Sequence, residues 1–168
     1  EQVARLEYIL RAVEDLDLLR IEAPLAEKEN ILAVHPQSHI DLIHANSPET
    51  GMIQLDGDTH MSPGTVTAAY RAAGGAICAV DTVISGKAKN AFVAIRPPGH
   101  HAEAQIPMGF CIFGNVAIAA KHALDFHKLP KVAVIDFDVH HGNGTQDLLW
   151  NEPRALTVTS HQMPLWPG

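Results

Sequence analysis

Residues 134–144 read Val-Ile-Asp-Phe-Asp-Val-His-His-Gly-Asn-Gly, an apolar strand that runs directly into acids and histidines. Carboxylates and imidazoles at the end of a buried strand are unfavourable unless they are paired or bind a metal. Because side chains alternate between the two faces of a strand, Asp136, Asp138 and His140 are expected to project the same way. The stretch therefore predicts a strand whose carboxyl end carries two potential metal ligands, Asp138 and His140, with Asp136 as a third acid behind them.

The rest of the chain alternates between helical and extended patterns. Helices are expected at residues 2–19, 29–45 (interrupted by Pro36), 65–85, 114–127 and 145–150, an irregular loop at 47–61, and strands at 91–95, 131–138 and 155–160. This order predicts a single α/β domain with a mostly parallel sheet. Residues 132–135 are apolar on both faces, as in a central parallel strand. Ligands of such sheets bind at the carboxyl ends of the strands, so the polar segments that follow 91–95 and 131–138 are expected to share one rim.

Composition narrows the class of protein. The chain has 168 residues, of which 46% are hydrophobic and 18% charged, which is typical of one globular domain with a core. A formal net charge of -7 without a basic cluster argues against direct nucleic-acid binding and favours a cationic substrate such as a polyamine or a lysine-rich segment. Cys78 and Cys111 lie in apolar surroundings and are expected to be buried thiols without a disulfide.

The sequence also bears on membrane insertion and on the limits of the domain. The sequence contains no signal peptide and no apolar run of about 18 residues, so we expect no membrane span and take a cytoplasmic location as the default. The chain begins within a helical pattern without an initiating Met and stops in the turn-like segment 165–168. We therefore expect residues 1–168 to form a single partial domain, incomplete at both ends.

Two further segments carry side chains suited to chemistry. His100 and His101 follow a rigid Pro-Pro-Gly turn, and a histidine that acts as a base needs an acceptor for its other ring nitrogen. Asp136 suits one histidine, and Asn143 suits the other, which it leaves less basic because it adds no charge. In residues 109–111, the glycine permits close approach of a substrate or a second backbone, and the following phenylalanine fits either an apolar channel wall or the core.

Other polar groups are interpreted as structural. His35 and His39 have helical metal-pair spacing, but Pro36 lies between them and no third ligand is near. His122 and His127 are expected to be exposed on a helix flank. Residues 56–60 contain two acids and a histidine but are expected to be a solvated loop. Residues 142–145 resemble a phosphate-cradling loop only loosely and match neither nucleotide-binding spacing.

Three motifs occur together in one order: Arg-Pro-Pro-Gly-His-His-Ala at 96–102, Gly-Phe-Cys at 109–111, and Asp-Phe-Asp-Val-His-His-Gly-Asn-Gly-Thr at 136–145. Together they resemble the histone deacetylase / acetylpolyamine amidohydrolase family, in its class II-like, bacterial-type form. The resemblance extends over nearly the whole chain, including residues 58–75 and 157–168. It implies a three-layer, open, mostly parallel sheet flanked by helices, as in arginases and deacetylases.

The resemblance also implies roles for individual residues. Asp138 and His140 correspond to two of three zinc ligands, His101 with Asn143 to the general base, and His100 with Asp136 to the second histidine. At the substrate end, Asp58 corresponds to a rim carboxylate, the Gly109 carbonyl to an acceptor for the substrate amide, and Phe110 to a channel wall. A structural potassium ion is implied at backbone carbonyls of the Asp-x-Asp-x-His segment, an Asp136 oxygen, and Thr159 or Ser160.

These roles describe zinc-dependent hydrolysis of acetyl-lysine or an acetylated polyamine, in which a histidine takes a proton from the attacking water and another protonates the leaving amine. The family's third zinc ligand, an Asp, and its oxyanion-stabilising Tyr lie beyond Gly168, so little activity is expected from this chain alone. Two other functions stay open: a metal-free binding or scaffold fragment, and an arginase-like two-metal hydrolase, against which the Pro-Pro-Gly-His-His loop counts. The acyl group, the amine and the oligomeric state are left open by the sequence.

Overall fold

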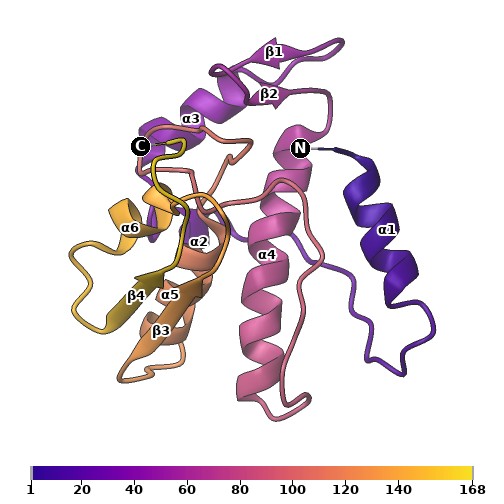
Figure 1. Cartoon of the computed structure of the whole chain (residues 1–168), viewed down its shortest axis with the longest axis vertical. Coiled ribbons are helices and arrows are strands. Elements are labelled where there is room, and N and C mark those ends of the chain that lie inside the picture. Colours follow the sequence, from indigo (N-terminus) through magenta and orange to yellow (C-terminus); the bar gives the residue numbers. More distant parts are fainter. Residues whose placement is uncertain (1, 168) are drawn as a thin grey trace.

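The computed structural model describes residues 2–167, with helices arranged beside two small sheets (Figure 1). The elements follow in the order α1 (Ala4–Ala12), α2 (Lys28–Leu32), α3 (Gln37–Ala45), β1 (Ile53–Gln54), β2 (His60–Met61), α4 (Thr65–Ile84), α5 (Asn115–Asp125), β3 (Val132–Asp136), α6 (Asn143–Leu149) and β4 (Ala155–Thr159). The fold is thus mixed α/β, as the sequence predicts, but its sheets are small.

The parallel sheet consists of β3 and β4, paired in register from Val132 opposite Ala155 to Asp136 opposite Thr159. Parallel neighbours need a crossover connection, and α6 provides it. Both strands and α6 fall within about three residues of their predicted bounds. β3 ends at Asp136, so the acids and histidines after it lie on a loop and not on the strand itself.

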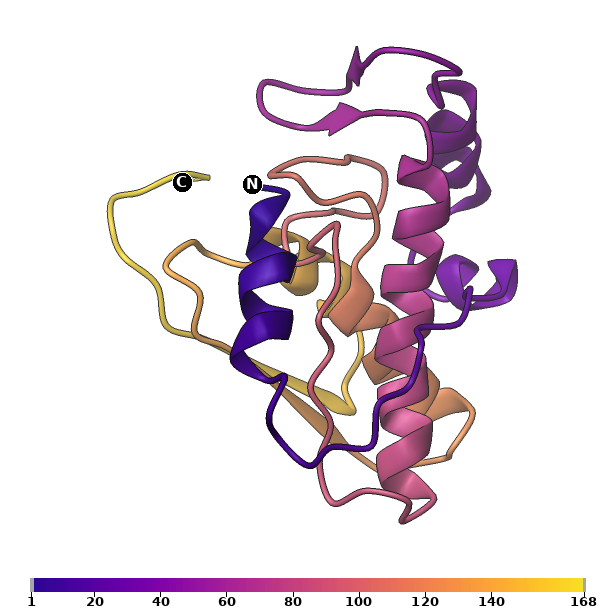
Figure 2. The same cartoon turned by 90° about the vertical axis from the view of Figure 1, so that its right-hand side faces the viewer.

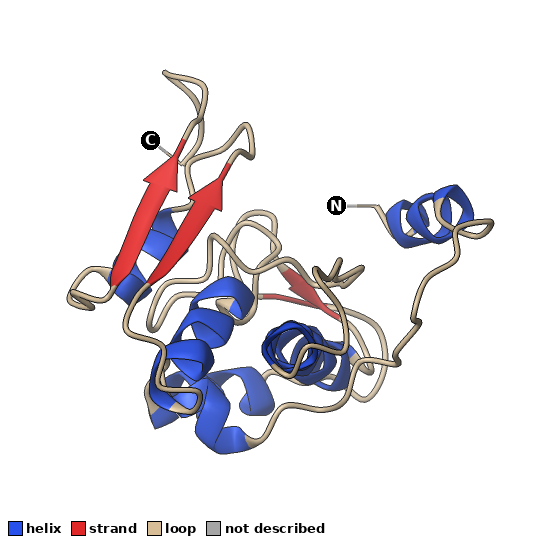
Figure 3. Ribbon diagram, turned by 90° about the horizontal axis from the view of Figure 1, so that it is seen from below, coloured by secondary structure: helices blue, strands red, loops and turns tan. Residues whose placement is uncertain are grey.

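The apolar pattern of residues 132–135 is typical of a central strand, but within the described residues β3 pairs with β4 alone and one of its faces is exposed. Val132 and Val134 pack against Ala117, Ala120 and Leu149 of α5 and α6. The opposite face is open: Ile135 is 66% exposed and Leu156 of β4 is 61% exposed. Figure 3 shows the two paired strands at one edge of the molecule. The pattern is therefore that of a strand with one packed face, although its sequence is apolar on both.

Residues 91–95 were predicted as a strand, and this prediction is wrong, because the segment has no regular secondary structure. It runs beside α4 instead of pairing with β3 (Figures 1 and 2). Val93 and Ile95 approach Gly75, where an added Cβ would lie 3.3 and 3.5 Å from their side chains. The Ile95 carbonyl accepts a hydrogen bond of 2.7 Å from Arg5 of α1. A short apolar run thus finds burial against a helix instead of partners in a ladder.

α4 forms over its predicted length, and its two glycines, Gly74 and Gly75, lie where other segments approach the helix closely. A Cβ on Gly74 would lie 2.7 Å from the backbone nitrogen of Ala26, so only glycine permits the 24–26 segment to pass this close. The Ala26 amide also donates to the carbonyl of Tyr70 on the same helix, at 3.0 Å. The predicted close packing against another backbone is confirmed.

The N-terminal helix is shorter than predicted. α1 ends at Ala12 instead of residue 19 and buries none of its side chains. Arg20 explains the early end, because its Nη2 donates to the carbonyls of Val13, Glu14 and Leu16 at 2.7, 3.0 and 3.3 Å. These carbonyls are thereby satisfied without continuing the helix.

The expectations for Pro36, for the loop 47–61 and for the free cysteines agree with the structure in the main. Pro36 separates α2 from α3 and is the residue from which α3 begins. The loop 47–61 contains a short antiparallel hairpin, β1 with β2. Both cysteines are free, with Cys111 buried and Cys78 partly buried. Within residues 2–167, no helix combines the length and apolarity needed to cross a bilayer.

Candidate active site

Two loops meet at the carboxyl end of β3. One contains the Pro-Pro-Gly-His-His motif, and the other follows Asp136. They are joined by the His100 ring, whose Nδ1 lies 2.9 Å from Asp136 Oδ2, and by the Thr145 amide, which donates to the His100 carbonyl at 3.1 Å. The structure thus brings the two sequence-predicted clusters to one place, although the segment before His100 is not a strand.

His100 and Asp136 form a half-buried ion-pair geometry, with side chains 18% and 16% exposed. The second Asp136 oxygen, Oδ1, accepts the backbone N–H of Asp138 at 3.1 Å. The hydrogen bond from His100, assisted by this amide, holds the pKa of Asp136 below its ordinary value although burial opposes the shift. Both carboxylate oxygens therefore have protein partners, and Asp136 is placed as a histidine partner.

Gly142 is required by this arrangement. A Cβ at position 142 would collide with the Asp136 carboxylate and approach His100 Nδ1 to 3.4 Å. The loop therefore needs glycine so that its backbone can pass over the His100–Asp136 pair.

His101 is buried and is oriented by an amide. Its Nδ1 lies 2.8 Å from Asn143 Oδ1, while Asn143 Nδ2 donates to Glu103 Oε1, also at 2.8 Å. Because a carboxylate can only accept from Asn143 Nδ2, the amide oxygen must face His101, and His101 Nδ1 carries the hydrogen. The other ring nitrogen, Nε2, is left with its lone pair.

Burial also lowers the pKa of His101, and the hydrogen bond to Asn143 opposes that shift only in part. Positive charge on His100 or His140 acts in the same direction as burial. The ring centroids of His100 and His101 are 3.9 Å apart, which is close enough for charge on His100 to lower the pKa of His101. At neutral pH, His101 is thus a neutral imidazole with a free basic nitrogen.

Asp138 and His140 present converging donors. Asp138 Oδ1 lies 3.2 Å from His140 Nδ1 and also accepts the His140 backbone N–H at 2.8 Å. In a tetrahedral zinc site with bonds of about 2.0–2.1 Å, neighbouring ligand atoms lie about 3.3 Å apart. The pair therefore fits two positions of a zinc site. Within residues 2–167, no third His, Cys, Asp or Glu joins these two in a metal-binding group.

The rim of the site is built on a chain of hydrogen bonds. Asp58 Oδ1 accepts the Gly109 amide and the Thr59 hydroxyl, both at 3.2 Å, and Thr59 Oγ1 accepts the Phe110 amide at 2.9 Å. The Gly109 carbonyl accepts a hydrogen bond from the Cys111 thiol at 3.3 Å. Burial raises the pKa of that thiol to about 12, which makes it inert. The predicted substrate-binding residues are thus adjacent in space.

Gly109 is a glycine for two reasons. Its φ is +59°, and a Cβ would lie 2.5 Å from His101 Cδ2 and 2.6 Å from Trp166 Cη2. Phe110 shares the left-handed conformation with φ 66° and is 39% exposed. Of the two alternatives for Phe110, the exposure favours a wall at the mouth of the site over a core position.

Two residues at the site escaped sequence reasoning. Trp166 packs edge-on against His101 at 4.6 Å and against His140 at 6.0 Å between ring centroids. Glu103, through Asn143, fixes the tautomer of His101. An aromatic in a turn-like segment could have been noticed beside Leu165 and Pro167, but no spacing in the sequence connects Glu103 to Asn143 forty residues away.

The potassium prediction stays a prediction. The Asp136 carbonyl accepts the Ser160 amide at 3.0 Å, and Thr159 Oγ1 lies 3.0 Å from His161 Nδ1. The strand pairing of β3 with β4 therefore places Thr159 and Ser160 beside Asp136, as that site would require.

The structural interpretation of His35 and His39 agrees with the structure. Both are buried and stacked at 4.5 Å. His35 accepts the Gly114 amide at Nε2, at 2.9 Å, and its Nδ1 lies 3.1 Å from the Ala104 carbonyl, while His39 reaches the Ile112 carbonyl at 2.8 Å. Burial lowers the pKa of His35 to about 4, so it is neutral and serves to join loops.

Two other candidate sites are also accounted for by local structure. Asp56 Oδ1 accepts the amides of Asp58 and Thr59 at 3.1 and 2.7 Å, a loop-forming role. In residues 142–145, where amides might cradle a phosphate, two amides are used internally: Thr145 donates to the His100 carbonyl and Asn143 to the His141 carbonyl.

The expectation for His122 and His127 was wrong. Their side chains are only 9% and 19% exposed, and both direct Nε2 at Asp81 Oδ1, at 2.7 and 2.6 Å. The helix-flank pattern did not reveal this, because the partner lies on α4, more than forty residues earlier.

Comparison with known proteins agrees with this geometry. The Histone deacetylase domain family matches residues 1–168, so the chain belongs to this family of zinc-dependent deacetylase hydrolases. A probable deacetylase of Archaeoglobus fulgidus is 40% identical over 151 residues, covering 90% of this chain and 41% of that protein. A histone deacetylase-like amidohydrolase of Pseudomonas aeruginosa is 41% identical over 145 residues, covering 86% of this chain and 38% of that protein.

Among solved structures, the crystal structure of the HDA15 HD domain superposes with a TM-score of 0.92 at 32% identity. The match covers 98% of this chain and 49% of the solved one. The chain therefore has the histone deacetylase fold and spans about two fifths of the length of the two curated relatives above.

Proposed function

We propose that this chain contributes the histidine and zinc-binding half of a site that hydrolyses an acetylated amine, either acetyl-lysine or an acetylated polyamine. The observation that carries the proposal is the position of His101. Its unprotonated Nε2 is fixed by Asn143, and its ring lies 5.9 Å from that of His140, the proposed zinc ligand. Membership of the deacetylase family supports the same reaction class.

Asp138 and His140 would hold the zinc, because their oxygen and nitrogen donors converge at a spacing that suits it. When bound, zinc polarises the amide carbonyl and makes water acidic enough to react near neutral pH. Since two donors converge in the described residues, we propose that residues 1–168 by themselves bind zinc weakly and turn over slowly. Thr159, Ser160 and Asp136 are proposed to hold the structural potassium.

The histidines divide the proton transfers. His101 accepts the proton of the attacking water at Nε2, for which its lowered pKa leaves it unprotonated at neutral pH. His100 is oriented by the ionised Asp136 and would give electrostatic support to the developing negative charge. One of the two then returns a proton to the leaving amine nitrogen.

The rim residues position the substrate. Trp166, packed against His101, and the partly exposed Phe110 at the rim would supply apolar walls that suit an aliphatic acyl-lysine or acylpolyamine stem. Asp58 is proposed to accept an N–H from the substrate backbone, and the acidic chain, with a net charge of -7, favours approach of a cationic substrate. We also infer that β3 and β4 belong to a three-layer, mostly parallel sheet, which the TM-score of 0.92 supports.

The test measures acetate release from an acetyl-lysine peptide and from an acetylated spermidine, using the natural polypeptide that contains these residues. His101→Ala is expected to reduce kcat by about 100- to 10,000-fold, because general base catalysis typically supplies that factor. His44→Ala, at an exposed histidine on α3, is the matched control and should leave kcat unchanged. Undiminished acetate release by His101→Ala would refute the proposal. A protein that contains no zinc by elemental analysis and releases no acetate would favour the metal-free binding or scaffold role.

A further inference from the structure

A second group of metal-binding side chains lies away from the candidate active site, at the junction of α4 and α5. Asp81 in the last turn of α4, His122 in the last turn of α5 and His127 just beyond α5 each offer one donor atom, and these atoms lie within 4.8 Å of one another. We propose that Asp81, His122 and His127 bind a divalent transition metal, with zinc as the natural occupant.

The donor set determines the class of ion. One carboxylate oxygen and two imidazole nitrogens suit zinc, cobalt or nickel, whereas calcium and magnesium prefer oxygen ligands alone. Both Nε2 atoms point at the same oxygen, Asp81 Oδ1, at 2.7 and 2.6 Å. Insertion of an ion requires these separations to open by about 0.6 Å, to the 3.3 Å expected between neighbouring zinc ligands.

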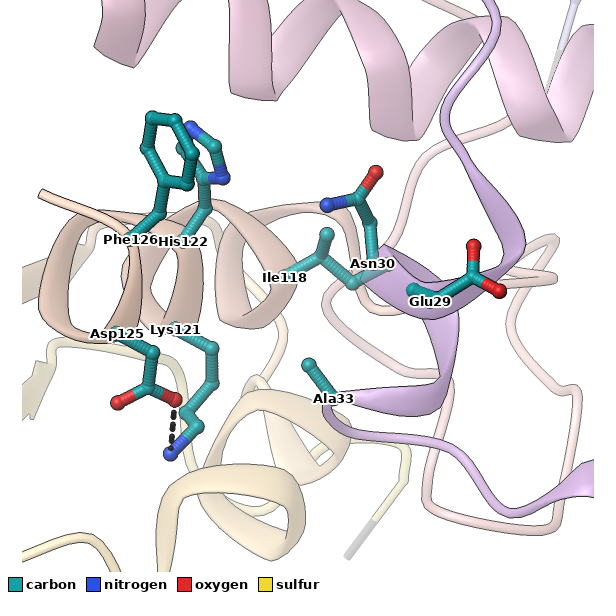
Figure 4. Close-up of a pocket in the computed structure, with 8 residues that line it drawn as sticks. All are labelled: Glu29, Asn30, Ala33, Ile118, Lys121, His122, Asp125 and Phe126. Carbon is teal, nitrogen blue, oxygen red and sulfur yellow. Dashed lines mark ion pairs between the residues drawn. The ribbon is translucent and has the colours of Figure 1, made fainter.

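The two imidazoles are held in place by a neighbouring aromatic ring. Phe126 stacks on His122 with ring centroids 4.8 Å apart and meets the edge of His127 at 5.0 Å. Figure 4 shows His122 and Phe126 side by side on α5, directed toward α4 and away from the Lys121–Asp125 ion pair. Phe126 is 69% exposed, so its packing contributes more to fixing the two rings than to filling the core. Pre-oriented ligands lower the entropic cost of metal binding.

The local electrostatic field also favours a cation. α4 ends at Ile84 and α5 at Asp125, so the carbonyl ends of both helices lie close to the three donors. Helix C-termini carry partial negative charge, and the Asp81 carboxylate adds a full one. An acid in the last turn of a helix is unfavourable unless a positive group offsets it. A divalent ion offsets the negative charge of the two helix C-termini and of the Asp81 carboxylate. Asp81 is 47% exposed, which leaves room for a water ligand.

The proposed site is separate from the catalytic one. His127 precedes β3, and the Asp138–His140 pair follows it, so the two sites lie at opposite ends of a five-residue strand. Such a strand spans roughly 16 Å. The second ion would therefore link α4 to α5 and take no part in hydrolysis.

The experiment titrates Co²⁺, and then competing Zn²⁺, into protein carrying Asp138→Asn and His140→Ala, which removes the catalytic donors. The visible absorption of bound Co²⁺ reports binding. One equivalent is expected to bind to this background. Adding either His127→Ala or Asp81→Asn should weaken binding by more than 100-fold, because losing even a partner of a ligand typically weakens it 10- to 100-fold.

His44→Ala in the same background is the control and should bind Co²⁺ normally. Asp81→Asn keeps the size of the side chain and a hydrogen-bond acceptor, so it decides the matter if His127→Ala is poorly folded by circular dichroism. The proposal is overturned if the background binds no Co²⁺ or Zn²⁺ at millimolar concentration, or if a folded Asp81→Asn variant binds as well as the background does. Because the catalytic donors are absent throughout, the result does not depend on the proposed hydrolase activity.

Discussion

The proposed catalytic cluster at the end of β3 and the Asp81–His122–His127 cluster are both built from carboxylates and imidazoles, but they are assembled differently. In the first, Asp138 and His140 lie two residues apart on one loop, and their donors converge at 3.2 Å. In the second, Asp81 is 41 residues from His122 and meets it only because α4 packs against α5. The first can therefore be seen in the sequence, and the second exists only in the fold.

The two clusters also differ in what surrounds them. In the proposed catalytic cluster, the Trp166 ring that packs against His101 is 41% exposed, and Phe110, at the rim, is 39% exposed. The second cluster has a single aromatic, Phe126, which contacts both of its imidazole rings. Accessible aromatic rings suit the first cluster, which must admit a substrate. A ring that holds both imidazoles suits the second cluster, which must only hold an ion.

The largest effect is expected from Asp138→Asn. Loss of a charged zinc donor from a pair that already lacks a described third ligand should reduce acetate release by at least about 100-fold, the scale of losing one electrostatic stabiliser of the transition state. Metal bound at the Asp81 cluster should be unaffected. Metal content by elemental analysis and acetate release would be measured together, and a parallel loss at both sites would show that the two clusters are not independent.

The free energy of unfolding is also expected to depend on pH through His35, a buried imidazole that belongs to neither cluster. Its folded pKa of about 4 lies below the ordinary value of 6.5, so the unfolded chain binds the proton more readily between these values. Stability is therefore fully present above pH 6.5 and is lost as pH falls toward 4, by about 3 kcal/mol in all. Urea unfolding across pH 4–7 would show this slope.

His35→Gln is the control for that slope. It should be less stable at pH 7, because His35 joins the Gly114 amide to the Ala104 carbonyl, but it should lose less stability on acidification. An identical pH slope in this variant would assign the titration to other groups.

A smaller effect is expected from Asn143→Ala. The hydrogen bond that His101 donates to Asn143 Oδ1 raises the pKa of His101, so its removal lowers that pKa further. A hydrogen bond to a charged group contributes about 1.5 kcal/mol, which corresponds to roughly one pH unit. The acid limb of kcat/KM should move to lower pH while the rate at the optimum falls about tenfold. If the acid limb moves to higher pH or stays in place, the ionisation that it reports is not that of His101.

The smallest effect is expected from Phe126→Ala. The ligands of the second cluster remain, but the ring that orients them is lost, so Co²⁺ affinity should fall by about tenfold, the lower end of the range for supporting residues. Acetate release should not change. Affinity equal to that of the parent would mean that packing of α4 on α5 alone orients the two imidazoles.

Much of the site could be predicted because its chemistry is concentrated in short segments. Residues 96–102, 109–111 and 136–145 place His100 near Asp136 and His101 near Asn143, and the structure brings these partners within 2.9 and 2.8 Å. Long helices such as α4 were also predictable, since their pattern repeats over many turns.

The failures have physical causes. Residues 91–95 resemble a strand because short apolar runs fit a sheet or a helix surface equally well, and in the structure Val93 and Ile95 lie against Gly75 of α4. The early end of α1 depends on Arg20 reaching back to three carbonyls. The roles of Glu103, Trp166 and Asp81 depend on contacts between distant segments, which hydrophobic patterns do not encode.

The most direct test of the central claim, that the cluster at the end of β3 is catalytic and the Asp81 cluster is not, is acetate release from an acetyl-lysine peptide by His101→Ala and His127→Ala measured side by side. The account predicts a loss of at least about 100-fold for His101→Ala and an unchanged kcat for His127→Ala. Retained activity in His101→Ala, or a loss confined to His127→Ala, would contradict it.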